Sequence, residues 1–105
     1  RQAIKKLERA VKLRPDALEY QAMLAYLEYQ IAETADVQMQ KAAEAETLAE
    51  QALAQDRKVA SAHTILGHFA KLAGNLEGAR DHYRRALELD ASDKEARPEF
   101  RQLRR

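Results

Sequence analysis

AGNLEGARDHYRRALELD, residues 73–90, holds two of the three glycines of this 105-residue chain, at the start of a run rich in helix-forming residues. Gly74 and Asn75 are typical of a tight corner that ends one helix and begins the next. The third glycine, Gly67, lies inside the preceding helical pattern, where glycine costs about 1 kcal/mol relative to alanine. The stretch therefore predicts two helices joined by a short turn, with a close helix contact at Gly67 to offset that cost.

The second helix of this stretch has two earlier counterparts in the chain. In all three copies, small residues recur seven positions apart around a central residue. The matching positions are Ala3, Leu7 and Ala10; Ala45, Ala49 and Ala52; and Ala79, Tyr83 and Ala86. The copies are separated by 42 and 34 residues. Their shared pattern is one face of a helix whose small residues allow close approach of a neighbouring helix. The chain therefore contains an internal repeat.

A different kind of helix precedes each of the later two copies, in ALEYQAMLAYLEYQIA and in VASAHTILGHFAKLA. Tyr20 and Leu24 of the first match Ala62 and Leu66 of the second, and Ala25 takes the place of the glycine that follows. Good helix formers dominate the composition, and only two prolines occur. The expected fold class is all-α.

These features resemble the tetratricopeptide repeat (TPR) family, whose unit is a helix–turn–helix of 34 residues. The resemblance implies about six helices, paired antiparallel and stacked as a short right-handed superhelical solenoid. The positions that match the repeat signature are Ala3, Ala10, Pro15, Leu24, Ala25, Ala45, Ala52, Leu66, Gly67, Gly74, Ala79, Tyr83 and Ala86. The chain departs from the family at His63, Ala70 and Ala91, where tryptophan, tyrosine and proline are favoured.

The resemblance covers the whole chain as one TPR-like domain. Its parts are the second helix of a partial repeat (1–15), a long repeat (16–57), a standard repeat (58–91) and a C-terminal capping helix (92–105). Because Arg1 falls inside a helical pattern, we expect a fragment of a larger protein.

The long repeat has eight residues more than the family unit, close to two helical turns. We expect each of its helices to be about one turn longer, with the corner between Glu33 and Val37 and a cap from Thr34 or Asp36. The alternative is one continuous helix over residues 16–56.

The last segment, SDKEARPEFRQLRR, begins with a capping-box pattern from Ser92 to Glu95. Ala96, Phe100 and Leu103 form an apolar stripe that could cover the final repeat. Pro98 must either kink this helix or lie near its start.

Catalytic, metal and cofactor sites are not expected. The chain has no cysteine, and its three histidines lack the spacing of metal ligands on one helical face. We therefore interpret His63 and His82 as packing or surface residues. Glutamates and serines fit solvated faces and helix caps, and no glycine-rich phosphate loop follows a strand. An enzyme is not indicated.

Charge is unevenly distributed along the chain. Residues 1–14 hold six bases and one acid, residues 15–56 hold one base and nine acids, and residues 57–105 are basic again. Lys5, Arg9 and Lys12 share one helical face, but no aromatic residue accompanies them, so nucleic-acid binding is not favoured. No apolar run is long enough to span a bilayer, and the absence of cysteine fits a cytoplasmic protein.

In the resembled family, partner peptides lie in a concave groove lined by the first helix of each repeat. Transferred to this chain, the groove residues are Glu19, Ala22, Tyr26, Tyr29, Gln30, Ser61, Thr64, His68, Lys71 and Leu72. Tyr26 and Tyr29 flank Leu27, which we expect to face the core, so at least one tyrosine should be partly exposed. The alternative is that both tyrosines pack against the extended second helix.

The expected function is that of a non-enzymatic protein–protein interaction module that binds a peptide or partner protein, with some basic character in the partner. The first alternative is a structural role, in which copies self-associate through the terminal helices. The second is nucleic-acid binding by the basic face.

Overall fold

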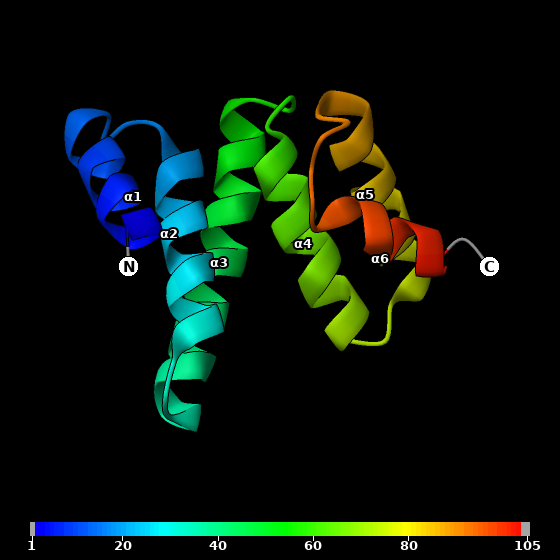
Figure 1. Ribbon diagram of the computed structural model, residues 1–105, viewed down its shortest axis with the longest axis horizontal. Coiled ribbons are helices and arrows are strands. Elements are labelled where there is room, and N and C mark those ends of the chain that lie inside the picture. Colours follow the sequence, from blue (N-terminus) through cyan, green and yellow to red (C-terminus); the bar gives the residue numbers. More distant parts are fainter. Residues whose placement is uncertain (1, 104–105) are drawn as a thin grey trace.

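The computed structural model describes residues 2–103, and its regular structure is entirely helical. The helices are α1 (Gln2–Leu13), α2 (Leu18–Ile31), α3 (Ala35–Gln55), α4 (Ala60–Leu72), α5 (Leu76–Leu89) and α6 (Ala96–Leu103). Helices adjacent in sequence pack side by side, and α1 and α6 lie at opposite sides of the array (Figure 1). The expected all-α class is confirmed. None of these helices is both long and apolar enough to cross a membrane.

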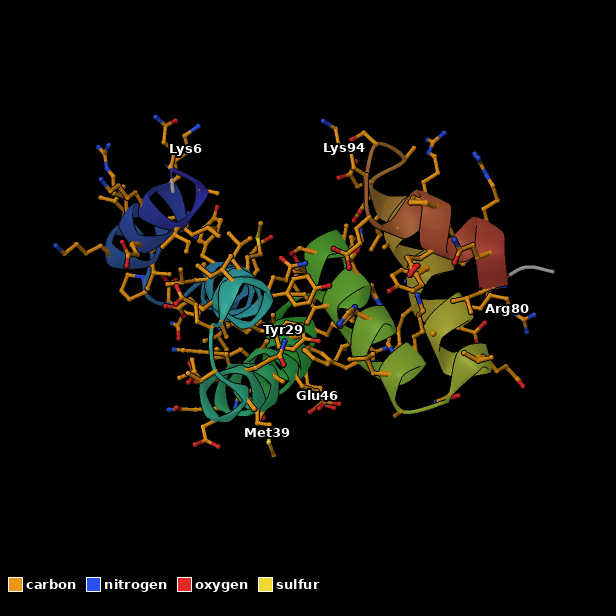
Figure 2. The ribbon with its side chains drawn as sticks, turned by 60° about the horizontal axis from the view of Figure 1, so that its bottom comes forward. Lys6, Tyr29, Met39, Glu46, Arg80 and Lys94 are labelled. Carbon is orange, nitrogen blue, oxygen red and sulfur yellow. The ribbon has the colours of Figure 1, made fainter. Side chains whose placement is uncertain are left out.

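The long repeat is a helical hairpin, so the alternative of one continuous helix is wrong. Helices α2 and α3 are the most extensively packed pair in the described chain. Their corner is capped by Thr34, whose Oγ1 accepts a hydrogen bond from the Val37 N–H at 3.2 Å. The extra length is not shared as expected: α3 has 21 residues against 14 in α5, whereas α2 has 14 against 13 in α4. The early turns of α3 therefore form an exposed tip, from which Met39 points outward (Figure 2).

The far end of the same hairpin is tied down by Gln55. Its side-chain Nε2 donates to the Asp16 carbonyl at 2.9 Å, and its Oε1 accepts from the Leu18 N–H at 3.2 Å. Because Ala17, the N-cap residue of α2, has no side-chain oxygen, Gln55 on α3 supplies the acceptor that α2 lacks.

The corner of the standard repeat explains Gly74. Its φ is +84°, a conformation that residues with a Cβ rarely adopt. The Gly74 N–H donates to the Lys71 carbonyl at 3.0 Å, and the Asn75 N–H donates to the Ala70 carbonyl at 2.9 Å. These two bonds are the Schellman motif that ends a helix. Asn75 then caps α5, because its Oδ1 accepts from the Gly78 N–H at 2.9 Å.

Gly67 is explained by the ring of Tyr83. A Cβ at position 67 would lie 3.1 Å from three atoms of that ring, which is closer than ordinary van der Waals contact. Tyr83 is fully buried on α5, with 0% of its surface exposed. The absence of a side chain at Gly67 therefore lets α4 and α5 close around the tyrosine.

The core is built largely from alanine and has two parts. The first lies among α2, α3 and α4 and contains Ala22, Ala25, Tyr26, Ala45, Ala49, Ala52, Val59, Ala62, Ile65, Leu66 and Phe69. The second lies between α5 and α6 and contains Ala79, Tyr83, Ala86 and Ala96. Of the remaining signature positions, Ala10 and Leu24 are half-buried, and Ala3 and Pro15 are exposed. Small residues on the packed faces allow close approach of the helices, which suits the seven-residue pattern in the sequence.

Burial on α2 differs from the expected register. Ala22, Ala25 and Tyr26 are buried, whereas Tyr20 and Leu24 are only half-buried. The spacing of the buried residues on α2 matches that of Ala62, Ile65 and Leu66 on α4. Packing against the long α3 determines which face of α2 is buried. An alignment of the sequences of α2 and α4 does not contain that information.

Helix α6 covers the end of the array, but its cap is not the expected one. Asp93 Oδ1 accepts hydrogen bonds from the N–H groups of Glu95 and Ala96, at 3.0 and 2.9 Å. The Ser92 hydroxyl instead donates to Asp90 at 2.6 Å, so the capping-box expectation is wrong. Pro98 lies in the first turn of α6, where no backbone N–H is needed, and the helix begins just before it.

Candidate functional site

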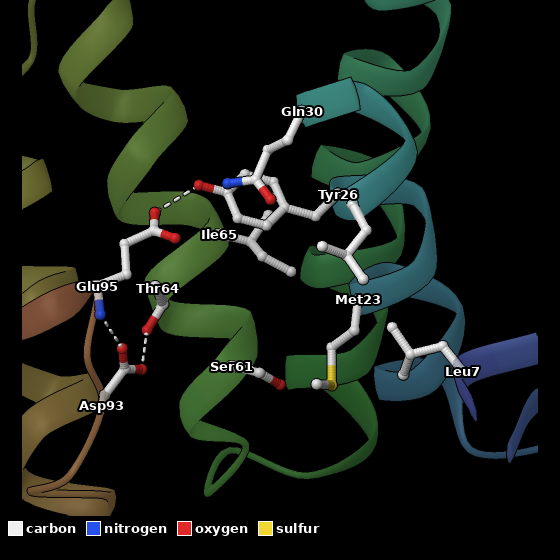
Figure 3. Close-up of a pocket in the computed structure, with 10 residues that line it drawn as sticks. Leu7, Met23, Tyr26, Gln30, Ser61, Thr64, Ile65, Asp93 and Glu95 are labelled. Carbon is white, nitrogen blue, oxygen red and sulfur yellow. Dashed lines mark hydrogen bonds between the residues drawn. The ribbon is translucent and has the colours of Figure 1, made fainter. Parts of the chain in front are cut away.

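A cleft of about 240 Å³ opens on the array between α2 and α4 (Figure 3). Helix α1 contributes one edge through Leu7, and the segment before α6 contributes the opposite edge. The lining residues are Leu7, Met23, Tyr26, Leu27, Gln30, Ser61, Thr64, Ile65, Asp93 and Glu95. Four separate parts of the chain therefore meet at this cleft.

The cleft combines apolar walls with two carboxylates. Asp93 Oδ2 accepts a hydrogen bond from the Thr64 hydroxyl at 2.6 Å, and the Glu95 carboxylate accepts one from the Tyr26 hydroxyl. Both donors are neutral, and none of the described residues that line the cleft is a lysine or an arginine. Two carboxylates thus face the cleft without a cation among these lining residues.

The environment of Glu95 disfavours its charged form. Burial raises the pKa of this carboxyl above its ordinary value of 4.5, and the negative charges of Asp93 and Glu99 act in the same direction. The hydrogen bond from Tyr26 and the charge of Lys71 oppose the rise. Burial, followed by the hydrogen bond to Glu95, also raises the pKa of the Tyr26 hydroxyl, which stays protonated as the donor.

Glu95→Gln is expected to make the protein more stable at neutral pH. Because the pKa of Glu95 is higher in the folded than in the unfolded state, this carboxyl contributes its full stability only below the unfolded pKa. That contribution is lost as the pH rises through the folded pKa. Glutamine has no charge to bury and still accepts from Tyr26. The gain in free energy of unfolding over wild type should shrink as pH falls from 7 to 4.5. Urea unfolding across this range measures it, with Glu46→Gln on the exposed face of α3 as control. A gain that does not change with pH would contradict this explanation.

Asp93→Ala is expected to lower the free energy of unfolding by about 1–2 kcal/mol, since it removes the cap of α6 and the acceptor of the buried Thr64 hydroxyl. Chemical denaturation followed by circular dichroism measures the loss. Ser92→Ala is the matched control and should change stability by less than about 0.5 kcal/mol. Equal losses in both variants would restore Ser92 as the cap.

Four of the residues expected in a groove line this cleft: Tyr26, Gln30, Ser61 and Thr64. Of these, Tyr26 is also a core residue, with 7% of its surface exposed. Two others lie elsewhere. Ala22 is buried in the core, and Glu19 borders a separate hollow beside the loops at the ends of α1 and α3.

Three further expected residues lie beside the cleft and already have partners. The Tyr29 hydroxyl and His68 Nε2 are 2.9 Å apart, and Figure 2 shows Tyr29 between α2 and α4. Their rings pack together with Tyr26 and Phe69. Lys71 forms an ion pair with Glu99 of α6, with 2.9 Å between Nζ and Oε2. Leu72, by contrast, is largely exposed at the end of α4.

Sequence reasoning missed six lining residues, of which Asp93 and Glu95 matter most. Both lie in a segment whose sequence indicates only the start of a helix. On α2, Met23 and Leu27 are four residues apart and therefore share a face. This spacing is a sequence signal that could have placed both residues in the lining of the cleft. Leu27, which we expect from the sequence to face the core, instead borders the cleft and is half-buried. Tyr29 is half-buried, as expected of at least one of the two tyrosines, whereas Tyr26 is a core residue that also borders the cleft.

No protein-family model matches the chain, and no curated protein matches it either.

The basic face of α1 is exposed at Lys5, Arg9 and Lys12. Within residues 2–103, no group of three or more histidine and acidic side chains is arranged to hold a metal ion.

Proposed function

We propose that this chain is a TPR-like interaction module that binds an extended segment of a partner protein in the cleft between α2 and α4. The observation that carries the proposal is the pairing of apolar walls with two carboxylates, with no lysine or arginine among the described residues of the lining. The helix–turn–helix units, with their alanine faces and the Gly67–Tyr83 contact, support the TPR resemblance. The absence of cysteine supports a place in the cytoplasm.

The chemistry of the cleft favours a basic side chain next to an apolar one. A lysine or arginine has an apolar stem that can lie along Met23 and Leu27 while its charged end reaches Asp93 or Glu95. The partly buried position of Glu95 strengthens this attraction relative to a fully exposed pair. An acidic peptide would meet like charge and be rejected.

Selection from a displayed library of random peptides tests the proposal, followed by fluorescence anisotropy with each selected peptide. The selected peptides should carry a lysine or arginine beside an apolar residue. Leu27→Ala and Glu95→Gln should each weaken binding about tenfold, equivalent to about 1.4 kcal/mol. Met39→Ala, on the exposed tip of α3, is the control and should leave binding unchanged.

The proposal fails if no peptide is selected, or if the selected peptides are acidic. It also fails if both cleft variants bind as tightly as wild type. Raising the salt concentration should weaken binding, because the attraction to the carboxylates is partly screened.

Self-association through α1 is a second candidate, favoured by one observation. Although α1 has an apolar face, none of its described residues is buried, and 77% of Leu13 is exposed at its end. Sedimentation over a range of concentrations tests this role. A dimer that dissociates on substitution Val11→Lys would support it, and a monomer at all concentrations would exclude it.

A further inference from the structure

Two histidines face each other between α4 and α5, away from the residues that line the cleft. His63 Nδ1 and His82 Nδ1 are 3.2 Å apart, and the ring centroids are separated by 5.4 Å. Both side chains are half-buried. A hydrogen bond between them needs one Nδ1–H and one free Nδ1 lone pair, so at most one of these two nitrogens is protonated in this arrangement.

The separation of the two nitrogens is also that of two ligands on one metal ion. Imidazole nitrogens bind Zn²⁺ at about 2.0–2.1 Å, so two of them at a tetrahedral angle lie about 3.3–3.4 Å apart. Replacing the shared proton by a metal ion would therefore lengthen the distance between the two nitrogens by only about 0.1–0.2 Å, with the rings turned so that both lone pairs point at the ion. Because the two residues come from different helices of one tight hairpin, the backbone already holds them together.

The surroundings of the pair favour neutral imidazoles. Burial lowers the pKa of both His63 and His82, which favours the neutral imidazoles that bind metal ions. The backbone of Arg57 partly opposes the lowering of the His63 pKa. The negative charge of Asp81 partly opposes the lowering of the His82 pKa. The positive charge of Arg85 lowers the His63 pKa further, and Arg85 itself forms an ion pair with Glu88 at 3.3 Å.

We propose that His63 and His82 together bind one Zn²⁺ ion through their Nδ1 atoms, with water filling the remaining positions. The proposal rests on the histidine pair alone and does not depend on the peptide cleft. Two protein ligands make an open site, and its metal would join α4 to α5 across the standard repeat. Cu²⁺ should bind the same nitrogens more tightly, as expected for this series of divalent ions.

Thermal unfolding of the chain without a histidine tag, with and without ZnCl₂, tests the site. An ion that binds only the folded state raises the melting temperature. We expect such a rise in wild type and its loss in both His63→Gln and His82→Gln. His68→Gln is the matched control, because His68 also lies on α4 but its Nε2 faces Tyr29. This variant should keep the rise relative to its own metal-free form.

Nitrogen NMR of the imidazoles in the wild-type chain gives a second readout that does not depend on how well the variants fold. Added Zn²⁺ should move the Nδ1 resonances of His63 and His82 and leave those of His68 in place. Three results would overturn the site: no rise in wild type, a rise that persists in full in His63→Gln or His82→Gln, or Nδ1 resonances that do not respond. Lowering the pH should remove the rise, because protons compete for the same nitrogens.

Discussion

Tyr83→Ala is expected to lower the free energy of unfolding by about 3–5 kcal/mol, the usual loss when a buried aromatic ring is removed. The ring of Tyr83 is fully buried in the core between α5 and α6 and fills the space left open at Gly67. Removing it would leave a cavity that the surrounding alanines are too small to fill. Denaturation with urea, followed by circular dichroism, measures the loss.

Tyr83→Phe is the control that separates the ring from its hydroxyl. The hydroxyl is buried and has no hydrogen-bond partner among residues 2–103. Burial raises its pKa, and Glu95, Glu99 and Asp93 raise it further, so the group stays neutral. Because loss of an unpaired buried hydroxyl removes a desolvation cost, Tyr83→Phe should be neutral or stabilising by up to about 1 kcal/mol. A clear loss of stability in Tyr83→Phe would mean that the hydroxyl has a partner after all.

Gly67→Val is expected to lower the free energy of unfolding by about 1–3 kcal/mol through overpacking. Valine has a better helix propensity than glycine, so a loss must come from the contact with Tyr83. Even the Cβ would lie 3.1 Å from the ring, and the buried ring has little room to retreat. The same unfolding measurement checks this prediction.

Two further substitutions bracket the effect at Gly67. Gly67→Ala adds only the Cβ, and its gain in helix propensity of about 1 kcal/mol offsets part of the crowding, so its loss should be smaller than that of Gly67→Val. Ala54→Val places valine on the exposed face of α3 and should cost less than about 0.7 kcal/mol. If Gly67→Val is no worse than Ala54→Val, the close approach of the two helices is not what requires glycine.

The sequence predicted the standard repeat well because its signals are local. Gly74 and Asn75 mark a corner that only a few backbone conformations satisfy, and the Schellman bonds form there. Alanines seven residues apart indicated which face of α5 packs inward, and Ala79 and Ala86 are both buried. Thr34, one of the two expected cap residues, is the N-cap of α3.

The site was predicted only in part because it depends on contacts between distant segments. Tyr26, Gln30, Ser61 and Thr64 follow from which faces of α2 and α4 meet. The two carboxylates do not, since Asp93 and Glu95 reach the cleft only because the segment before α6 runs beside α4 (Figure 3). Their partners are 29 and 69 residues away in sequence. The facing histidines are 19 residues apart on two helices, so single-helix spacing rules did not bring them together.

What the sequence determined by itself is the helical class, the repeat pattern and the reason for a glycine corner at Gly74. These depend on periodicity and backbone preference, which neighbouring residues specify directly. Only the tertiary structure decided that Tyr26 is buried in the core at the edge of the cleft and that Leu27 borders the cleft. It also decided that nearly all of the extra residues lengthen α3, and that two acids border a largely apolar cleft. The physical reason is that burial and charge pairing depend on which surfaces meet. The length of α3 and the path of residues 90–95 determine which surfaces these are.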